Sequence, residues 1–140
     1  MDTRIATFET QVPDWKTWNS KFLATCRLVV EDHEKVVGWA ALSPTSKRVV
    51  YQGVVEVTIY IDLNQTGKGV GTQLLSALVE ASEAAGFWTL QSSIFTANKS
   101  SIRLHQRAGF RIIGTRHKIA KRDGIWQDTV FMERRSNLII

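Results

Sequence analysis

Alternating hydrophobic and polar positions predict a strand over residues 54–61. Apolar and polar side chains follow one another with period two in this segment, which is typical of a strand with one buried face. The expected buried face carries Val55, Val57, Ile59 and Ile61. The opposite face carries Glu56, and a carboxylate within so apolar a strand is the first sign of a functional group.

The remaining pattern predicts helices alternating with strands. Apolar residues recur at helical spacing in 13–23, in 70–85 and in 98–108, and a glycine typical of a helix C-terminus follows the last two. Further strands are predicted over 27–31, 36–42, 88–95, 111–118 and 126–132. The order of elements predicts an α/β fold in which helices pack on a mixed sheet.

Composition bounds the class of protein. The chain has 140 residues, 44% of them hydrophobic and 22% charged, which fits one globular domain over 1–140. No apolar run approaches the roughly 20 residues that cross a bilayer, and the first residues lack a signal core. Cys26 is the single cysteine, and no Cys/His cluster has metal-ligand spacing. We therefore expect a cytoplasmic protein without a metal or a membrane partner.

Charge is divided unevenly along the chain. Residues 1–98 hold 8 Lys/Arg against 10 Asp/Glu, a balance of −2, whereas residues 99–140 hold 10 against 3, a balance of +7. A basic C-terminal third indicates an anionic partner, either nucleic acid or a phosphorylated small molecule. A solvated basic face would give the same balance, so charge alone does not decide between these interpretations.

A glycine-rich loop lies between the strand 54–61 and the helix that follows it. Glycines allow the backbone to approach a ligand closely, and the N–H groups of a helix N-terminus attract phosphate oxygens. The loop lacks the serine or threonine after Gly-Lys of a Walker motif, and Thr72 breaks the dinucleotide fingerprint. The remaining interpretations are an anion-binding loop, with Lys68 adding a charge, and a merely tight turn.

Four ordered blocks of sequence resemble the GNAT acetyltransferase superfamily, and within it the phosphinothricin-acetyltransferase-like branch. The blocks are Thr66-Gly67-Lys68-Gly69-Val70-Gly71, Asn98-x-x-Ser101-x-x-Leu104-His105-x-x-x-Gly109-Phe110, Arg48-x-x-Tyr51-x-x-x-x-Glu56, and residues 121–128. The sequence departs from the family at Thr66, where Gln or Arg is usual. It also begins at a segment that the family usually places after a first strand and helix, so the resemblance implies that this unit is absent.

The resemblance implies that the protein binds acetyl-CoA and transfers its acetyl group to a primary amine. The backbone of Ile59, Tyr60 and Ile61 would hold the pantetheine arm. Asn98 would contact the same arm, although the residue also suits a plain helix N-cap. The pyrophosphate would lie on the loop residues Thr66, Gly67, Lys68, Gly69, Val70, Gly71 and Thr72.

The resemblance also assigns catalytic residues. Glu56 would act as general base, through a water molecule; the alternative is a carboxylate paired structurally with Arg48 or another cation. His105 would protonate the leaving sulfur or act as base, and the alternative is a histidine packed against the sheet. Arg48, Tyr51 and Trp126 are the candidate acceptor-binding residues, with a surface arginine and a core tryptophan as the structural alternatives.

Several functions remain open at this stage. The leading hypothesis is an N-acetyltransferase acting on a small amino acid such as phosphinothricin or methionine sulfoximine, in a homodimer. Acetylation of a protein N-terminus or lysine is a second enzymatic reading. A catalytically impaired acetyl-CoA sensor or interaction module is a third. Nucleic-acid binding is disfavoured because neither an aromatic platform nor a recognition helix is evident in the sequence.

Overall fold

Six strands and three α-helices make up the part of the chain that the structure, a computed structural model, describes: residues 15–62 and 69–140. The predicted order of helices and strands is confirmed. In chain order the elements are α1 (Trp15–Lys21), β1 (Leu28–Asp32), β2 (Lys35–Pro44), the 3-10 turn η1 (Val49–Tyr51), β3 (Val54–Ile61), α2 (Val70–Ala84), β4 (Thr89–Phe95), α3 (Lys99–Arg107), β5 (Arg111–Arg122) and β6 (Ile125–Arg135).

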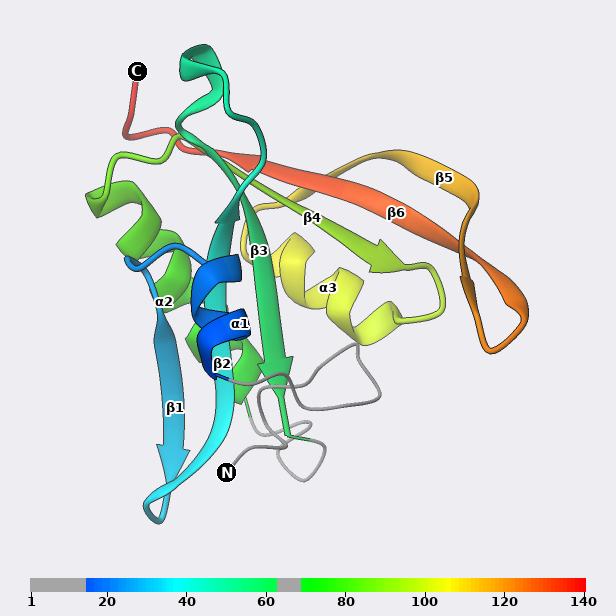
Figure 1. Cartoon of the computed structure of the whole chain (residues 1–140), viewed down its shortest axis with the longest axis horizontal. Helices are drawn as coiled ribbons and strands as arrows, with labels where there is room; N and C mark the ends of the chain where they lie inside the picture. The colour runs from blue at the N-terminus through cyan, green and yellow to red at the C-terminus, as the bar shows by residue number, and fades with distance from the viewer. Residues whose placement is uncertain (1–14, 63–68) are drawn as a thin grey trace.

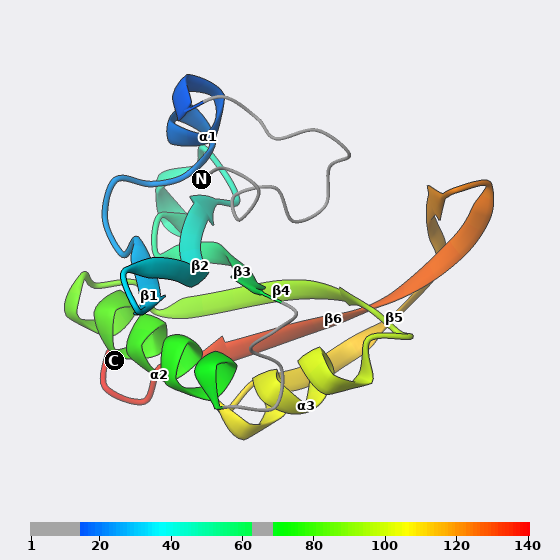
Figure 2. The same ribbon diagram turned by 90° about the horizontal axis from the view of Figure 1, so that it is seen from below.

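One mixed sheet with the strand order β1-β2-β3-β4-β6-β5 forms the centre of the fold. Its neighbours are antiparallel except for β3 and β4, which run parallel. Helices α2 and α3 cover one face, and α1 lies on the other (Figures 1 and 2). The predicted α/β class with helices packed on a mixed sheet is therefore confirmed. No helix in the described ranges is long and apolar enough to cross a membrane.

The main core lies between the sheet and α2. Leu74, Leu75 and Leu78 point from the helix onto the inner side chains of the strands, among them Val55 and Met132, and each of these five is at most 2% exposed. One buried residue of α2 is polar. Ser82 is 1% exposed, and its hydroxyl donates to the carbonyl of Val79 at 2.7 Å, which satisfies the polar group.

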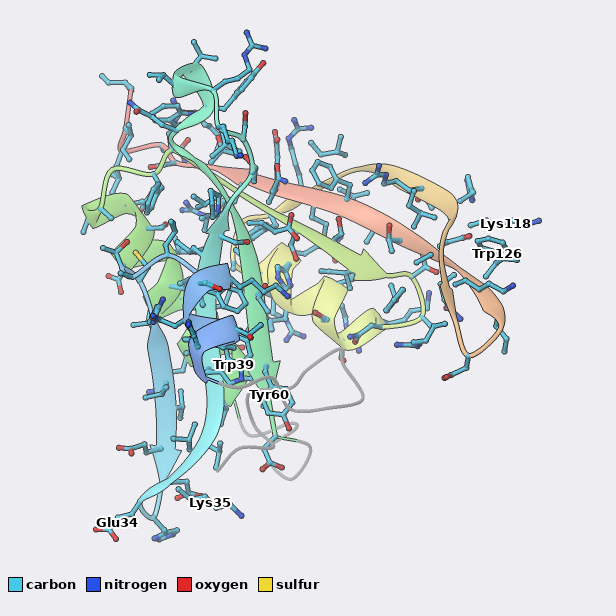
Figure 3. The ribbon with its side chains drawn as sticks, viewed as in Figure 1. Glu34, Lys35, Trp39, Tyr60, Lys118 and Trp126 are labelled. Atoms are coloured by element: carbon cyan, nitrogen blue, oxygen red, sulfur yellow. The ribbon has the colours of Figure 1, made fainter. Side chains whose placement is uncertain are left out.

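A smaller aromatic cluster forms the core on the opposite face. Trp18 of α1 and Phe22, which follows that helix, pack against Trp39 of β2 at ring distances of 5.5 and 5.7 Å. Tyr60 of β3 lies opposite Trp39 in the strand register and stacks on its ring at 6.5 Å (Figure 3). Residues 54–61 thus contribute to both faces: the even-numbered side chains share the face of α1 and the odd-numbered ones share the face of α2.

Two glycines end the helices that cover the main core. Gly86 and Gly109 have φ of +91° and +97°, which an L-residue adopts only with strain. At the second of these ends, Gly109 N–H donates to the carbonyl of Gln106 and Phe110 N–H donates to that of His105, each at 3.0 Å. These two bonds form a Schellman motif, whose usual apolar contact is made here by the Phe110 ring against His105.

The parallel pair β3–β4 is joined over a short stretch only. Val54, Val55 and Glu56 pair with Thr89, Leu90 and Gln91, and beyond this point the two strands diverge into a V (Figure 1). The carbonyl of Gly53 accepts the N–H groups of both Trp88 and Thr89, at 2.9 and 3.1 Å, and so closes the narrow end. Beyond Glu56, β3 has no strand partner on that side among the described residues.

The last two strands extend as a long hairpin, called the arm below (residues 112–130). Both strands run beyond their predicted ends at Lys118 and Met132. Asp123 and Gly124 form the turn with φ of +53° and +78°, the two left-handed positions of a type I′ hairpin. Figure 2 shows the arm bending away from α2 and α3, toward the face that carries α1.

A bulge interrupts the arm near its middle. The register passes from Arg116 opposite Thr129 to Ala120 opposite Gln127, so three residues of β5 face the single residue Asp128. The carboxylate of Asp128 accepts the N–H of Lys118 at 2.8 Å, and it lies 3.3 Å from the His117 ring. The backbone bond and the His117 contact lower the pKa of Asp128 below its ordinary value.

Substitution of Gly53 tests the packing at the narrow end of the V. A Cβ at Gly53 would lie 2.1 Å from the rigid indole of Trp88, whereas one at Gly114, on the exposed strand β5, would meet nothing within 4 Å. We expect Gly53→Ala to lower the free energy of unfolding by about 1–3 kcal/mol in denaturant titrations. The matched control Gly114→Ala should leave it unchanged or slightly raised. Equal effects of the two changes would contradict the prediction.

Candidate active site

Glu56 lies where the two parallel strands separate. It occupies the last paired position of β3, opposite Gln91 of β4, and its side chain is half-buried on the face of α1. The Gln91 amide donates to a Glu56 carboxylate oxygen over a long distance of 3.4 Å. The predicted base is therefore located at the vertex of the V, with its second oxygen outside this contact.

Glu56 belongs to a polar row that crosses the sheet. The strand register places Ser43, Glu56, Gln91, Glu133 and Arg111 side by side on five neighbouring strands. At the far end the Arg111 guanidinium donates to Glu133 at 2.7 Å. The side-chain hydrogen bond recorded for Glu56 is thus with the amide of Gln91. The alternative pairing with Arg48 is not seen, because the Arg48 guanidinium lies over the Tyr51 ring.

His105 approaches the sheet from the other face. It sits in the last turn of α3 and is only 1% exposed, with the Phe110 ring against its edge at a centroid distance of 5.0 Å. Burial lowers the pKa of His105 below its ordinary value of 6.5, and the hydrogen bond to the backbone of Ser101 opposes this in part. The side chain is therefore a neutral imidazole at neutral pH.

The hydrogen bond of the His105 ring fixes its tautomer. Nδ1 lies 2.8 Å from the carbonyl oxygen of Ser101, which can only accept, so Nδ1 carries the proton. Nε2 is then an unprotonated acceptor, and it is buried without a hydrogen-bond partner among the described residues. In this state His105 can receive a proton or a hydrogen bond at Nε2, but it has no proton to donate there.

Helix α2 begins at the wide end of the V, and no side chain of a described residue is recorded as capping its N-terminus. Gly69 is its N-cap, in the left-handed conformation with φ of +78°, and no side chain of that residue caps the helix. The first N–H groups of such a helix have no partner within it and favour an anion. Of the predicted loop residues, Thr66, Gly67 and Lys68 lie outside the described residues, and Gly69, Val70, Gly71 and Thr72 form this helix start.

Gly71 has a packing role that the loop motif does not reveal. A Cβ there would lie 3.1 Å from Leu104 of α3, so the glycine lets the first turn of α2 approach α3 closely. At the start of α3, the Asn98 side-chain oxygen accepts the N–H of Ser101 and the hydroxyl of Ser100, both at 3.2 Å. Asn98 is therefore an N-cap, and only its NH₂ group is left to meet a ligand.

The other predicted residues are spread over the molecule. Ile59, Tyr60 and Ile61 form the part of β3 that has diverged from β4, so their backbone borders the V. Arg48 and Tyr51 lie in the exposed segment before β3, near the narrow end of the V. Trp126 is 56% exposed near the tip of the arm and points away from the body of the molecule (Figure 3). The structure does not bring it to Glu56.

Sequence reasoning missed Gln91 as a neighbour of Glu56. Its signal is a polar side chain in the strand 88–95, but only the register between β3 and β4 shows that it faces the carboxylate. Burial raises the pKa of the Cys26 thiol, which favours its protonated form. Within the described ranges, no three His, Cys, Asp or Glu side chains are grouped to hold a metal ion.

Comparison with known proteins extends these observations. The profile of the Acetyltransferase (GNAT) family matches residues 3–110. An L-methionine sulfoximine/L-methionine sulfone acetyltransferase of Pseudomonas aeruginosa is 36% identical over 99 residues, which cover 71% of this chain and 58% of the relative. A phosphinothricin N-acetyltransferase of Streptomyces coelicolor is 31% identical over 103 residues, 74% of this chain and 60% of the relative. The chain thus spans about three fifths of these curated relatives.

Solved structures confirm the fold. A GNAT superfamily phosphinothricin acetyltransferase from Sinorhizobium meliloti, crystallised with AcCoA, superposes with a TM-score of 0.77 at 33% identity, over 94% of this chain and 74% of that one. The family match ends at residue 110, before β5 begins. The absence of a first strand and helix, expected from the resemblance, stays a prediction.

The buried neutral state of His105 predicts a pH dependence of stability. Because its pKa is lower in the folded protein, the unfolded chain binds a proton more readily at mildly acidic pH. The contribution of neutral His105 to the free energy of unfolding is complete above the ordinary pKa of 6.5. It is lost as the pH falls toward the pKa of His105 in the folded protein. Denaturant titrations between about pH 7.5 and 5.5 should show a smaller loss of stability for His105→Gln than for the natural protein.

The control for this measurement is His33, whose side chain is 94% exposed in the turn between β1 and β2. We expect His33→Asn to keep the pH dependence of the natural protein. An unchanged dependence in His105→Gln would show that His105 titrates alike in the folded and unfolded states.

Proposed function

The chain belongs to the GNAT acetyltransferase family, and we propose that it transfers the acetyl group of acetyl-CoA to the primary amine of a small amino-acid-like acceptor. The observation that carries this proposal is the position of Glu56 at the vertex of an opening between two parallel strands. Its carboxylate lies where the backbone pairing between β3 and β4 ends, on the face of the sheet opposite α2 and α3.

Acetyl-CoA fits the described residues on three counts. The half of β3 that has diverged from β4 offers its backbone groups to the extended pantetheine chain of acetyl-CoA, which would pair with them as an additional strand would. The uncapped start of α2 suits a pyrophosphate. The Asn98 NH₂ group is available at the start of α3. Bound there, acetyl-CoA supplies an activated acetyl group, and a backbone N–H of β3 stabilises the negative charge that develops on its carbonyl oxygen.

Glu56 acts as the general base in this proposal. An amine must lose a proton before it attacks, and with an amine pKa of about 8–10 this costs roughly 1–4 kcal/mol near neutral pH. Glu56 takes that proton through a water molecule, on the face of the sheet that α1 and the arm share. The Gln91 amide holds one carboxylate oxygen, which leaves the other to orient the water.

His105 takes a different part. Its tautomer leaves Nε2 buried and without a proton, so His105 does not protonate the sulfur. The thiolate needs little help in leaving, since a thiol of pKa about 8.5 costs only some 2 kcal/mol to ionise at neutral pH. Solvent supplies that proton.

The acceptor class rests on the relatives. Their names specify methionine sulfoximine, methionine sulfone and phosphinothricin. We propose an acceptor of this kind for the present chain, with Arg48 and Tyr51 near its carboxylate and Trp126 as a more distant candidate. A homodimer and a cytoplasmic location belong to the same proposal, and nucleic-acid binding does not.

A CoA-thiol release assay tests the proposed activity directly. We expect release from acetyl-CoA to depend on an added acceptor, tried across free amino acids, phosphinothricin and methionine sulfoximine. Binding of acetyl-CoA without release from any acceptor would favour the sensor function instead. Release with peptides only would favour acetylation of proteins.

Substitution of Glu56 and of His105 tests the roles proposed for them. Glu56→Gln keeps the size of the side chain but removes the base, and we expect it to lower kcat by about 10²–10⁴-fold. His105→Asn should lower kcat by less, because the residue does not transfer the essential proton. Glu80→Gln, an exposed change on α2, is the matched control and should leave kcat unchanged. Equal or reversed losses at positions 56 and 105 would overturn the assignment.

A further inference from the structure

Two arginines of the arm share the face of the sheet that carries Glu56. Side chains at paired positions of neighbouring strands point to the same face. Phe95 pairs with Thr129, and Thr129 pairs with Arg116, so these three form a row parallel to the row of Glu56. Arg122, paired with Ile125 two positions beyond Gln127, belongs to the same face.

Arg122 is held in place by an aromatic ring. Its guanidinium lies 4.4 Å from the centre of the Phe95 ring, at the end of β4. Among the described residues neither Arg122 nor Arg116 forms an ion pair, whereas two carboxylates of β6 are engaged: Asp128 by His117 and the Lys118 N–H, and Glu133 by Arg111. A guanidinium fixed by its face keeps its N–H donors for another group.

The adjacent cation has the opposite orientation. Lys121 pairs with Trp126, and its ammonium lies 5.4 Å from that ring, on the outer face of the arm. Figure 3 shows Trp126 beside Lys118 on this outer side. Lys121 and Arg122 are therefore neighbouring cations, each resting on an aromatic ring, of which only Arg122 faces the side of Glu56.

The spacing along β4 relates Arg122 to the proposed chemistry. Phe95 lies four residues beyond Gln91, the partner of Glu56, which is about 13 Å along a strand. Three hydrogen bonds, from Glu56 to water, from water to the amine and from the far end of the acceptor to Arg122, take up about 8 Å. When the Glu56 carboxylate and the Arg122 guanidinium are taken to be as far apart as Gln91 and Phe95 along β4, about 5 Å remains for the acceptor, which corresponds to roughly four covalent bonds.

We propose that Arg122, held on Phe95 and assisted by Arg116, is a specificity-determining subsite that binds an anionic group on the side chain of the acceptor. This inference rests on the proposed function, since the amine must lie beside Glu56. The α-carboxylate is only two bonds from the amine and is too near to reach Arg122. The subsite therefore selects amino acids whose anionic group, a phosphinate or a carboxylate, ends the side chain about four bonds away.

Two acceptors of nearly equal shape differ in the charge at the end of the side chain, so comparing them tests the effect of that charge alone. Phosphinothricin ends in a methylphosphinate anion and methionine sulfone in a neutral methylsulfone. We expect the natural protein to favour phosphinothricin, and Arg122→Ala to raise its KM about 10-fold or more, with little change for methionine sulfone or acetyl-CoA. Lys121→Ala removes the neighbouring cation on the outer face and should change none of these constants. Arg116→Ala should have a smaller effect than Arg122→Ala, because no ring fixes it.

Calorimetric binding of phosphinothricin to each variant separates this inference from the proposed function. Binding that depends on Arg122 but is followed by no acetyl transfer would support the subsite and overturn the proposed activity. Turnover without a preference for phosphinothricin would support the activity and overturn the subsite. Equal losses for both acceptors in Arg122→Ala, an equal effect of Lys121→Ala, or no binding to the natural protein would each overturn the subsite too.

Discussion

The short pairing between β3 and β4 is the constraint on which the rest of the structure depends. Backbone groups of neighbouring strands normally pair along their whole length, because an unpaired buried group is costly. Here the pairing ends at Glu56 and Gln91, and the groups beyond must find water or a ligand. The same divergence leaves the Glu56 carboxylate beside the unpaired stretch of β3.

Much of the fold could be predicted from the sequence because its signals are local. The alternation in 54–61 and the glycines after α2 and α3 each report on their own segment, and all were confirmed. The full length of the arm could not be predicted. Its strands are largely exposed, so they lack a buried face to read, and Lys118 adopts a left-handed φ of +51° that no residue type announces.

The candidate site could be predicted in part, for a related reason. Glu56 is conspicuous because a charge interrupts an apolar strand, whereas Asn98 and His105 came from the resemblance. Gln91 and Arg122 gain their meaning only from the register between strands distant in sequence, and a one-residue shift would turn each to the other face. The tautomer of His105 depends likewise on a carbonyl of its own helix, which a pattern of residue types does not contain.

Because the arm bends toward the face of α1, the candidate functional residues lie on two opposite surfaces of the sheet. The helix start, Asn98 and His105 belong to the face of α2 and α3, while Arg122, Phe95 and the aromatic cluster belong to the other. Substitutions on opposite faces of one sheet share few contacts, so their effects combine almost independently. Under the proposed function, substitutions on one surface would change the choice of acceptor, while the residues that bind acetyl-CoA on the other surface would be left unaltered.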